Sequence, residues 1–403
     1  MAAGFSPLDE RLRLGPSQLS PSLVERAVLL GTLLPFGQAR RVLERFTRVG
    51  VSAETIRVWT ARAGGAAEAL EDADLAEVER RLPDAPPGPA VQQLSVDGAM
   101  VGLRDGSWVE VKTLAIGTVT CPAARADSDP VTGDLSYFSR LADADSFGRL
   151  ATVETHRRGT PTAGTVVGVV DGALWCQGFL DLQRENAVRI LDFAHAAGYL
   201  AQAAEARYPT EPVRSQTWFS DQRRELRSGD ADVVIAHLAA WLEDDSGAQT
   251  GPIGVAHGYL ASRRAQLRYA RFRAAGYPIG SGIVESANKL IVEERLKGRG
   301  MHWARHNVNP LVCLRCLVGN GRWDTAWPRI WEQVRQDVRT ATAQRRTRRR
   351  LRVTPAIPPT PLATAAPNVD ASAAPARPKL VINGKPTNEH PWRSHDLRSR
   401  VTA

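Results

Sequence analysis

The first 81 residues carry apolar side chains at helical spacing. The stretch PSLVERAVLLGTLLPFGQARRVLERF is followed, after a short turn at Gly50, by GVSAETIRVWTARAGG. Ser52 stands where its hydroxyl can cap the second helix. Two helices joined by a short turn form the outline of a helix-turn-helix, although an ordinary helical hairpin has the same outline. The side chains expected to face DNA are Thr55, Arg57, Thr60 and Arg62.

A proline-rich segment, residues 82–92, predicts a linker, and the period of apolar positions changes after it. QLSVDGAMVGL and SWVEVKTLAIGTVT are rich in β-branched residues and enclose a turn at RDG, so they predict a hairpin. LSYFSRL predicts a third strand, DADSFGRLATVETHRRG a helix that ends at Gly159, and TVVGVVDGALW a buried strand. The short run VRIL, 188–191, fits a strand or a helix.

Residues 200–275 are polar and mostly helical in pattern, and another helix is predicted around 323–340. Seven arginines and no acid lie between 339 and 352. We expect this run to be a flexible arm that adheres to nucleic acid with strongly salt-dependent affinity. The proline- and alanine-rich segment after it is typical of disordered chain.

Composition narrows the class of partner. The 403 residues carry a formal net charge of +9, which favours polyanions, with nucleic acid first and a membrane surface as the main rival. No apolar run approaches the ~20 residues of a spanning helix, and the N-terminus lacks the apolar stretch of a secretory signal. Four cysteines do not suggest a disulfide scaffold, so we expect a cytoplasmic location.

Two aspartates, Asp97 and Asp171, each end an apolar strand-like run and are followed directly by glycine. Two such strands side by side would bring the carboxylates together, where they would repel each other unless one took up a proton. A hard divalent cation such as Mg²⁺ removes this repulsion. Glu285, near a helix start in PIGSGIVESANKLI, is a candidate third ligand. Two cations about 3.5–4 Å apart could then activate a water and stabilise the leaving oxygen of a phosphodiester.

Each acid also has a purely structural interpretation. VDG marks an ordinary strand exit where aspartate bonds its own backbone, and Glu285 could simply favour the helix dipole. Asp181 and Asp192 are rivals for the second acid. Asp171 is preferred because it ends the most apolar strand.

Several motifs in the same order resemble those of DDE transposases, the enzymes of bacterial insertion sequences, in the ISKra-like branch related to the Mutator group. The motifs are VDGAMVGLRDGSWVEVKTLAIG, VVDGALW, ILDFAHAAGYL, GSGIVESANKLI, RLKGRGMHW and HPWR. The resemblance runs from about residue 25 to residue 320 and reappears at 389–393. The region before residue 20 is brief for such an enzyme, so we expect part of the end-recognition region to be missing.

The resemblance implies an α/β fold with an RNase H-like catalytic core, an α-helical insertion, and an all-α helix-turn-helix region before the core. The stretch between Asp171 and Glu285 is far too long for a bare loop, as such an insertion requires. The implied domains are a DNA-binding helical region at 1–81, a linker at 82–92, the first part of the core at 93–199, the insertion at 200–275, the last part of the core at 276–340, and a basic, mostly disordered tail at 341–403.

Carried over by position, the resemblance implies that Asp97, Asp171 and Glu285 are catalytic and bind two Mg²⁺ ions, for which Mn²⁺ is expected to substitute. The DFAH motif implicates Asp192 and His195, with His195 contacting phosphate or moving a proton near neutral pH. The alternative for His195 is a helix residue bonded to its neighbour.

Further residues near Glu285 are predicted to contact DNA, with a solvated basic face as the alternative. They are Asn288, Lys289, Arg295, Lys297 and Arg299. Trp303 could stack on an unpaired base, although a tryptophan is more often part of a core. Cys313 and Cys316, with His302 and His306 before them, resemble a set of zinc ligands, but their apolar neighbours favour a buried helix.

The sequence therefore predicts a transposase that cuts transposon ends and joins 3′-hydroxyls to target DNA with Mg²⁺ and without a covalent enzyme intermediate. The expected partners are transposon-end DNA, target DNA and further copies of the chain, at the nucleoid and not at a membrane. One alternative is an RNase H-like nuclease without strand transfer. The other is a transposase-derived DNA-binding protein that has lost catalysis, against which the intact acids argue.

Overall fold

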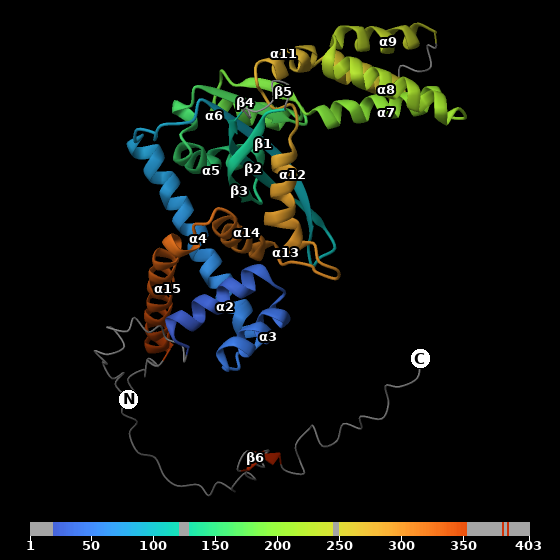
Figure 1. Ribbon diagram of the computed structural model, residues 1–403. Coiled ribbons are helices and arrows are strands. Elements are labelled where there is room, and N and C mark those ends of the chain that lie inside the picture. The colour runs from blue at the N-terminus through green and yellow to red at the C-terminus, as the bar shows by residue number, and fades with distance from the viewer. Residues whose placement is uncertain (1–18, 121–128, 245–249, 353–380, 383–384, 387–403) are drawn as a thin grey trace, which may run out of the picture. The chain divides into compact units, whose positions relative to one another are not determined.

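Three helices form the N-terminal region of the computed structural model, which describes residues 19–120, 129–244, 250–352, 381–382 and 385–386 (Figure 1). The helices are α2 (Pro21–Leu33), α3 (Phe36–Thr47) and α4 (Ala53–Arg81). The Ser20 hydroxyl caps α2, and the Ser52 hydroxyl accepts a hydrogen bond of 3.0 Å from the Thr55 backbone at the start of α4. Ser52 therefore caps the second helix as the sequence predicts.

A five-stranded sheet lies at the centre of the chain. Its strands are β1 (Val91–Gly102), β2 (Trp108–Thr120), β3 (Val131–Arg140), β4 (Thr165–Val170) and β5 (Val188–Leu191). The spatial order is β3-β2-β1-β4-β5. The first three strands pair antiparallel, whereas β4 pairs in parallel with both β1 and β5. This mixed α/β order is consistent with an RNase H-like topology.

The sheet has two apolar faces because side chains alternate along each strand. One face packs on α5 (Ala144–Arg157) and α6 (Leu174–Gln183), and the other packs on a helical run and on α14 (Val308–Gly319). That run consists of α12 (Gly282–Ala287), the π-helical segment η4 (Asn288–Glu293) and α13 (Glu294–Leu296). On β1, Val96 belongs to the α5 side, whereas Ala99 and Val101 belong to the α12 side. The alternation therefore turns Asp97 toward α12.

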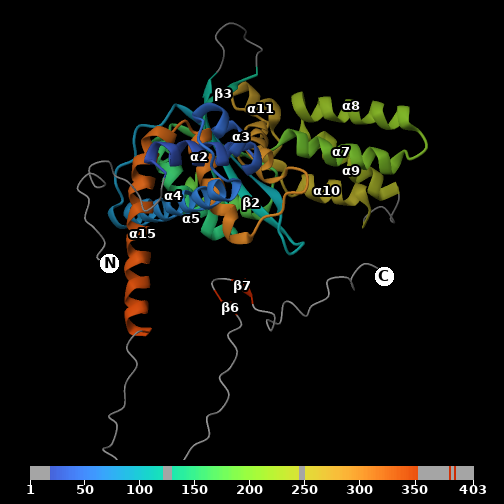
Figure 2. The ribbon, with the colours of Figure 1, turned by 90° about the horizontal axis from the view of Figure 1, so that it is seen from below.

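A layer of helices separates β5 from α12. It contains α7 (Phe193–Arg207), α8 (Pro212–Ser228), α9 (Ala231–Asp244), α10 (Pro252–Ala261) and α11 (Tyr269–Ala274). In Figure 1, α7, α8 and α9 project from the β5 side of the sheet, and Figure 2 shows the same helices extending away from the sheet. The apolar cluster inside this layer continues onto the sheet through Val167, Val169 and Ile190. The helical segment predicted from its polar composition is therefore packed onto the sheet through a shared core.

The C-terminal helix α15 (Trp323–Arg352) lies against α4. Three of its tryptophans, Trp323, Trp327 and Trp331, stack one after another, and the Trp331 ring lies 6.0 Å from the Trp59 ring of α4. Residues 346–403 form a second unit, in which β6 (Val381–Ile382) pairs with β7 (Lys385–Pro386). Among the described helices, none combines the length and apolarity that crossing a membrane requires.

Two sequence predictions are wrong in these helices. Thr60, predicted to face DNA, is only 3% exposed, because its hydroxyl donates to the Ile56 carbonyl and its side chain packs closely on Gly31 of α2. Residues 341–352 continue α15 as helix instead of a flexible arm, since alanine, glutamine and arginine all favour helix. The rest of the predicted tail, with the HPWR motif, lies outside the described residues apart from β6 and β7.

Helix α4 approaches α14 closely at Gly64, where a Cβ would lie 2.2 Å from the Pro310 carbonyl oxygen. We expect Gly64→Ala to lower the free energy of unfolding by about 1–3 kcal/mol, a typical result of overpacking. At the adjacent Gly65 a Cβ would have open space, so Gly65→Ala should raise the free energy of unfolding by up to about 1 kcal/mol through helix propensity. Urea denaturation measures both, and equal effects of one sign would contradict this close approach.

Candidate active site

Asp97 lies within β1 on the face that α12 covers. Its Oδ2 accepts a hydrogen bond of 2.9 Å from Asn288 Nδ2. Burial raises the pKa of the Asp97 carboxyl, and the nearby Asp171 carboxylate raises it further, while hydrogen bonds from the Gly98 backbone and Asn288 partly offset the increase. The Asp171 carboxylate is therefore close enough to influence the ionisation of Asp97.

Asp171 directly follows β4, the strand that pairs in parallel with β1. Its Oδ1 accepts a hydrogen bond of 2.9 Å from the Ala173 backbone, as expected of an aspartate at a strand exit. The same oxygen lies 3.4 Å from Cys176 Sγ, which lies 3.9 Å from the Val96 carbonyl oxygen. Burial raises the pKa of this thiol, and both Asp171 and Asp97 raise it further. The thiol thus lies between Asp171 and the residue that precedes Asp97.

The turn that carries Asp171 is held by the helical insertion. The Tyr259 hydroxyl of α10 donates to the Asp171 carbonyl oxygen, and Arg263 donates to the Gly172 carbonyl oxygen at 2.9 Å and 3.3 Å. Gly172 has a φ of 84°, and a Cβ there would lie 2.6 Å from Arg263 Nε. Glycine is thus required by both its conformation and its neighbours.

Asp192 and His195 form a second polar group beside these acids. Asp192 is 1% exposed, and its Oδ2 accepts a 2.8 Å hydrogen bond from the His195 backbone and lies 3.0 Å from His195 Nδ1. Its Oδ1 accepts a hydrogen bond of 2.7 Å from the Ser281 backbone. Burial opposes ionisation of Asp192, but these hydrogen bonds outweigh it and lower its pKa. The hydrogen bond with Asp192 is also the main reason why the pKa of His195 is raised, with smaller contributions from Asp171 and Asp97.

Glu285 is exposed near the start of α12, and no hydrogen bond joins its carboxylate to another described residue. Asn288 lies one turn further on, at the start of η4, and is buried against Asp97. The prediction that Asn288 faces phosphates is therefore wrong. Positions three apart share a side of a helix, so Glu285 lies on the Asp97 side of α12.

In η4 the buried Arg315 donates to the carbonyl oxygens of Leu290 and Ile291.

The oxygen atoms around Asp97 suit a hard divalent cation. Asn288 Oδ1 is buried without a hydrogen-bond partner among the described residues, beside the carboxylate that its own Nδ2 binds. Together with the Asp97 and Asp171 carboxylates it forms a set of hard donors. Within the described ranges, however, no three His, Cys, Asp or Glu side chains are gathered so as to hold a metal ion. The predicted three-acid set is not assembled in this arrangement, and Glu285 as a ligand stays a prediction.

Most of the predicted DNA-contacting residues lie on the surface. The exposed ones are Arg62, Lys289, Lys297 and Arg299. Lys297 pairs with Glu293 at 2.6 Å, and the half-exposed Arg57 pairs with Glu54 at 2.6 Å. These ion pairs reduce the positive charge that Lys297 and Arg57 can offer to a phosphate.

Arg295 and Trp303 have structural contacts instead. Arg295 is 1% exposed, donates to the Gly31 carbonyl oxygen at 3.0 Å and 3.2 Å, and lies over the rings of Phe36 and Trp303. The Trp303 indole donates to the Leu296 carbonyl oxygen at 3.0 Å. Arg295 is covered by the N-terminal helices and does not lie on an exposed surface, and its contact with DNA stays a prediction.

The remaining candidates also have structural partners. Asp181, a rival second acid, forms an ion pair with Arg189 on the surface. Cys313 and Cys316 are buried in α14, and Cys313 Sγ lies 2.6 Å from Arg140 Nη1. The buried-helix interpretation of the CxxC segment is therefore confirmed.

Sequence reasoning missed three residues of the site and misplaced a fourth. Cys176 lies five residues after Asp171, in the first turn of the helix that follows this acid. This short spacing in the sequence could have indicated that the thiol lies near Asp171. The position of Asn288 after Glu285 predicts a residue that faces phosphates, whereas its side chain is buried against Asp97. Tyr259 and Arg263 are distant in sequence from the turn that they bind, so no local pattern indicates them.

No protein-family model matches the chain, and a search of curated proteins finds no match.

Asp192→Asn should lower the pKa of His195, because the hydrogen bond with that carboxylate contributes most to raising it above 6.5. A raised histidine pKa stabilises the fold fully below pH 6.5, and this stabilisation is lost as pH rises through the folded-state pKa. Asparagine still caps α7, which limits other effects. NMR titration, with His195→Gln to assign the imidazole signal, should give a midpoint above 6.5 in the native protein and a lower one in the variant. Equal midpoints would exclude this coupling.

Proposed function

We propose that the protein is a DDE-type DNA transposase, which cuts the ends of a mobile DNA element and joins them to target DNA. The observation that carries the proposal is the proximity of Asp97 and Asp171, which lie in and directly after neighbouring parallel strands of a sheet ordered β3-β2-β1-β4-β5. The family resemblance of the sequence motifs and the net charge of +9 support the same proposal.

Mg²⁺ would be held by the carboxylates of Asp97 and Asp171 and by Asn288 Oδ1, which has no hydrogen-bond partner among the described residues. Glu285 would complete a two-ion site. Bound there, Mg²⁺ would supply the positive charge that stabilises the leaving oxygen of a phosphodiester. The buried amide of Asn288 orients the Asp97 carboxylate, and Tyr259 and Arg263 fix the turn that carries Asp171. The chain therefore holds both acids from outside the strands on which they lie.

His195 is the residue placed to move a proton in this proposal. Its side chain is 48% exposed, and its Nδ1 is engaged by Asp192, so Nε2 is the atom that would exchange a proton with water or DNA. Asp192 keeps the imidazole in one orientation and favours its protonated form. The protonated ring would also place a positive charge beside the phosphate.

Asp97→Asn and Asp171→Asn should each reduce Mg²⁺-dependent cutting of a supercoiled plasmid carrying the element's ends by about a hundredfold or more, since each removes an anionic ligand of the Mg²⁺ that would stabilise the leaving oxygen. Asp181→Asn is the matched control, because Asp181 is a nearby acid that only pairs with Arg189. Glu285→Gln tests the third acid in the same assay. Full activity in Asp97→Asn or Asp171→Asn would remove that residue from the site.

The product distribution separates the candidate activities. Cutting followed by insertion into a second plasmid supports a transposase. Nicking without insertion would instead identify an RNase H-like nuclease, and a mobility shift without any cutting would identify a DNA-binding protein.

Tyr259→Phe should slow cutting by about two- to tenfold, the kinetic equivalent of one hydrogen bond of about 0.5–1.5 kcal/mol. It removes the hydroxyl that holds the Asp171 backbone but keeps the ring stacked on Tyr199, whose centroid lies 4.0 Å away. Tyr199→Phe is the control for the stack. We expect unchanged DNA affinity in both variants, and an equal loss of cutting in both would assign the effect to the stack.

A further inference from the structure

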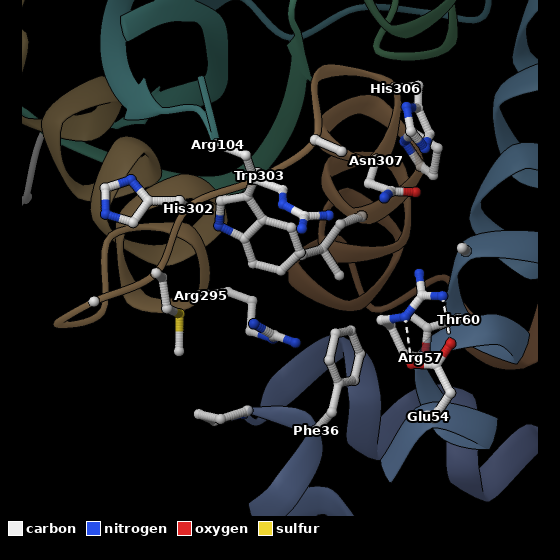
Figure 3. A pocket seen from close by; sticks show the side chains of 17 residues that line it. Phe36, Glu54, Arg57, Thr60, Arg104, Arg295, His302, Trp303, His306 and Asn307 are labelled. Atoms are coloured by element: carbon white, nitrogen blue, oxygen red, sulfur yellow. Dashed lines mark hydrogen bonds and ion pairs between the residues drawn. The ribbon is translucent and has the colours of Figure 1, made fainter. Parts of the chain in front are cut away.

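A cavity of about 660 Å³ lies between the N-terminal helices and the sheet region, apart from the acid pair (Figure 3). Its walls come from α3, α4, the β1–β2 turn, α13, α14 and the segment between α13 and α14. Five basic side chains line it, against the single acid Glu54. They are Arg57, Arg104, Arg295, His302 and His306. A cavity of this size and charge suits a small anionic group.

Arg295 is a buried cation without a carboxylate partner among the described residues. Two of its nitrogens bind the Gly31 carbonyl oxygen near the C-terminal end of α2, where the helix dipole compensates part of the charge. Burial, with a smaller contribution from Arg315, nevertheless lowers its pKa to about 10. Because an incompletely compensated buried charge is costly, an anion in the adjoining cavity would stabilise it.

Two further arginines differ in how much of their charge is available. Arg57 is held by Glu54 through hydrogen bonds of 2.8 Å and 2.6 Å, so this pair contributes little net charge. Arg104 is exposed at the β1–β2 turn, and no described acid pairs with it. Arg104 therefore offers a ligand the most accessible charge, and Glu54 weakens the field of Arg57.

The cavity has a defined position relative to the acids. Arg104 lies two residues after Gly102, the last residue of β1, and Asp97 lies five residues before Gly102. At about 3.3 Å per residue, the far end of β1 is roughly 17 Å from Asp97. One DNA strand advances about 3.4 Å per nucleotide, so a strand along β1 would reach the cavity about five nucleotides from the acids.

We propose that this cavity binds a backbone phosphate of the DNA strand whose scissile phosphate lies at Asp97 and Asp171. The inference rests on the proposed function, since it names a second contact for the same strand. Arginine suits this contact because its planar guanidinium can bind two phosphate oxygens. Arg104 supplies the accessible charge and Arg295 the buried one, whereas the pairing of Arg57 with Glu54 limits the affinity.

The test uses the full chain, a fluorescein-labelled 30-base-pair duplex and EDTA, so that binding is measured by anisotropy without cutting. We expect Arg104→Gln to weaken binding three- to tenfold and to lower the slope of log affinity against log salt by about 0.9, the value for one phosphate contact. Glu54→Gln should tighten binding, because it releases Arg57. The two variants thus change affinity in opposite directions.

The ion pair of Arg149 with Glu79, at 2.8 Å, provides matched controls on the α5 side of the sheet. Arg149→Gln and Glu79→Gln change the net charge as the test variants do, and we expect little effect from either. Equal effects in the test and control variants, or no effect in Arg104→Gln, would overturn the proposal. So would a complete lack of DNA binding by the native chain.

A second arm separates a DNA strand from free phosphate. If millimolar inorganic phosphate raises the melting temperature of the native chain but not of Arg104→Gln, while the DNA salt slope is the same for both, the cavity takes free phosphate and the strand contact is refuted. Failure of the proposed function is distinguishable, because cutting is scored separately with Mg²⁺. An Arg104 effect on binding without any cutting would leave the cavity as a DNA contact of a non-catalytic protein.

Discussion

The repulsion between two carboxylates on neighbouring strands is the constraint around which the site is organised. Burial is the main cost of charging Asp97, and the nearby Asp171 carboxylate adds to it. The neighbouring groups reduce it in different ways: Asn288 and the Ala173 backbone donate hydrogen bonds, and His195 supplies a positive charge when protonated. A site that gathers negative charge in this way is preorganised for a positively charged ligand.

The segments that hold these acids in place come from outside the two strands. Tyr259 and Tyr269 of the helical insertion donate to the carbonyl oxygens of Asp171 and Leu191, at the ends of β4 and β5. The segment that returns to the sheet donates from Ser281 to Asp192. The helical insertion therefore starts at the edge of the sheet formed by β5, and the chain returns to the same edge at Ser281. A change that loosens α10 or α11 would therefore first displace the ends of β4 and β5, where Asp171 and Asp192 lie.

The sequence predicts those features that depend on neighbours in the chain. The Ser52 cap, the alternation along β1 and the end of α5 before Gly159 follow from local chemistry, and so does the position of Asp171 directly after β4. The prediction that Asp97 ends a strand is wrong, because β1 continues beyond it to Gly102. The burial of Thr60 and Arg295 could not be predicted, because it arises where the N-terminal helices dock on α13. The orientation of Asn288 likewise depends on how α12 lies across β1, which no spacing within the helix reveals.

The number of residues in the π-helical segment η4 fixes how the polar site is oriented relative to the apolar core. Asn288 at its beginning points to Asp97, whereas Ile291, Val292 and, beyond it, Leu296 fill the core beneath the sheet. One residue fewer in this wide turn would rotate one group relative to the other by about 100°, the angle per residue of an α-helix. Arg315 binds the carbonyl oxygens along this turn and so favours its present width. We therefore expect η4 to tolerate side-chain substitutions far more readily than the insertion or deletion of one residue.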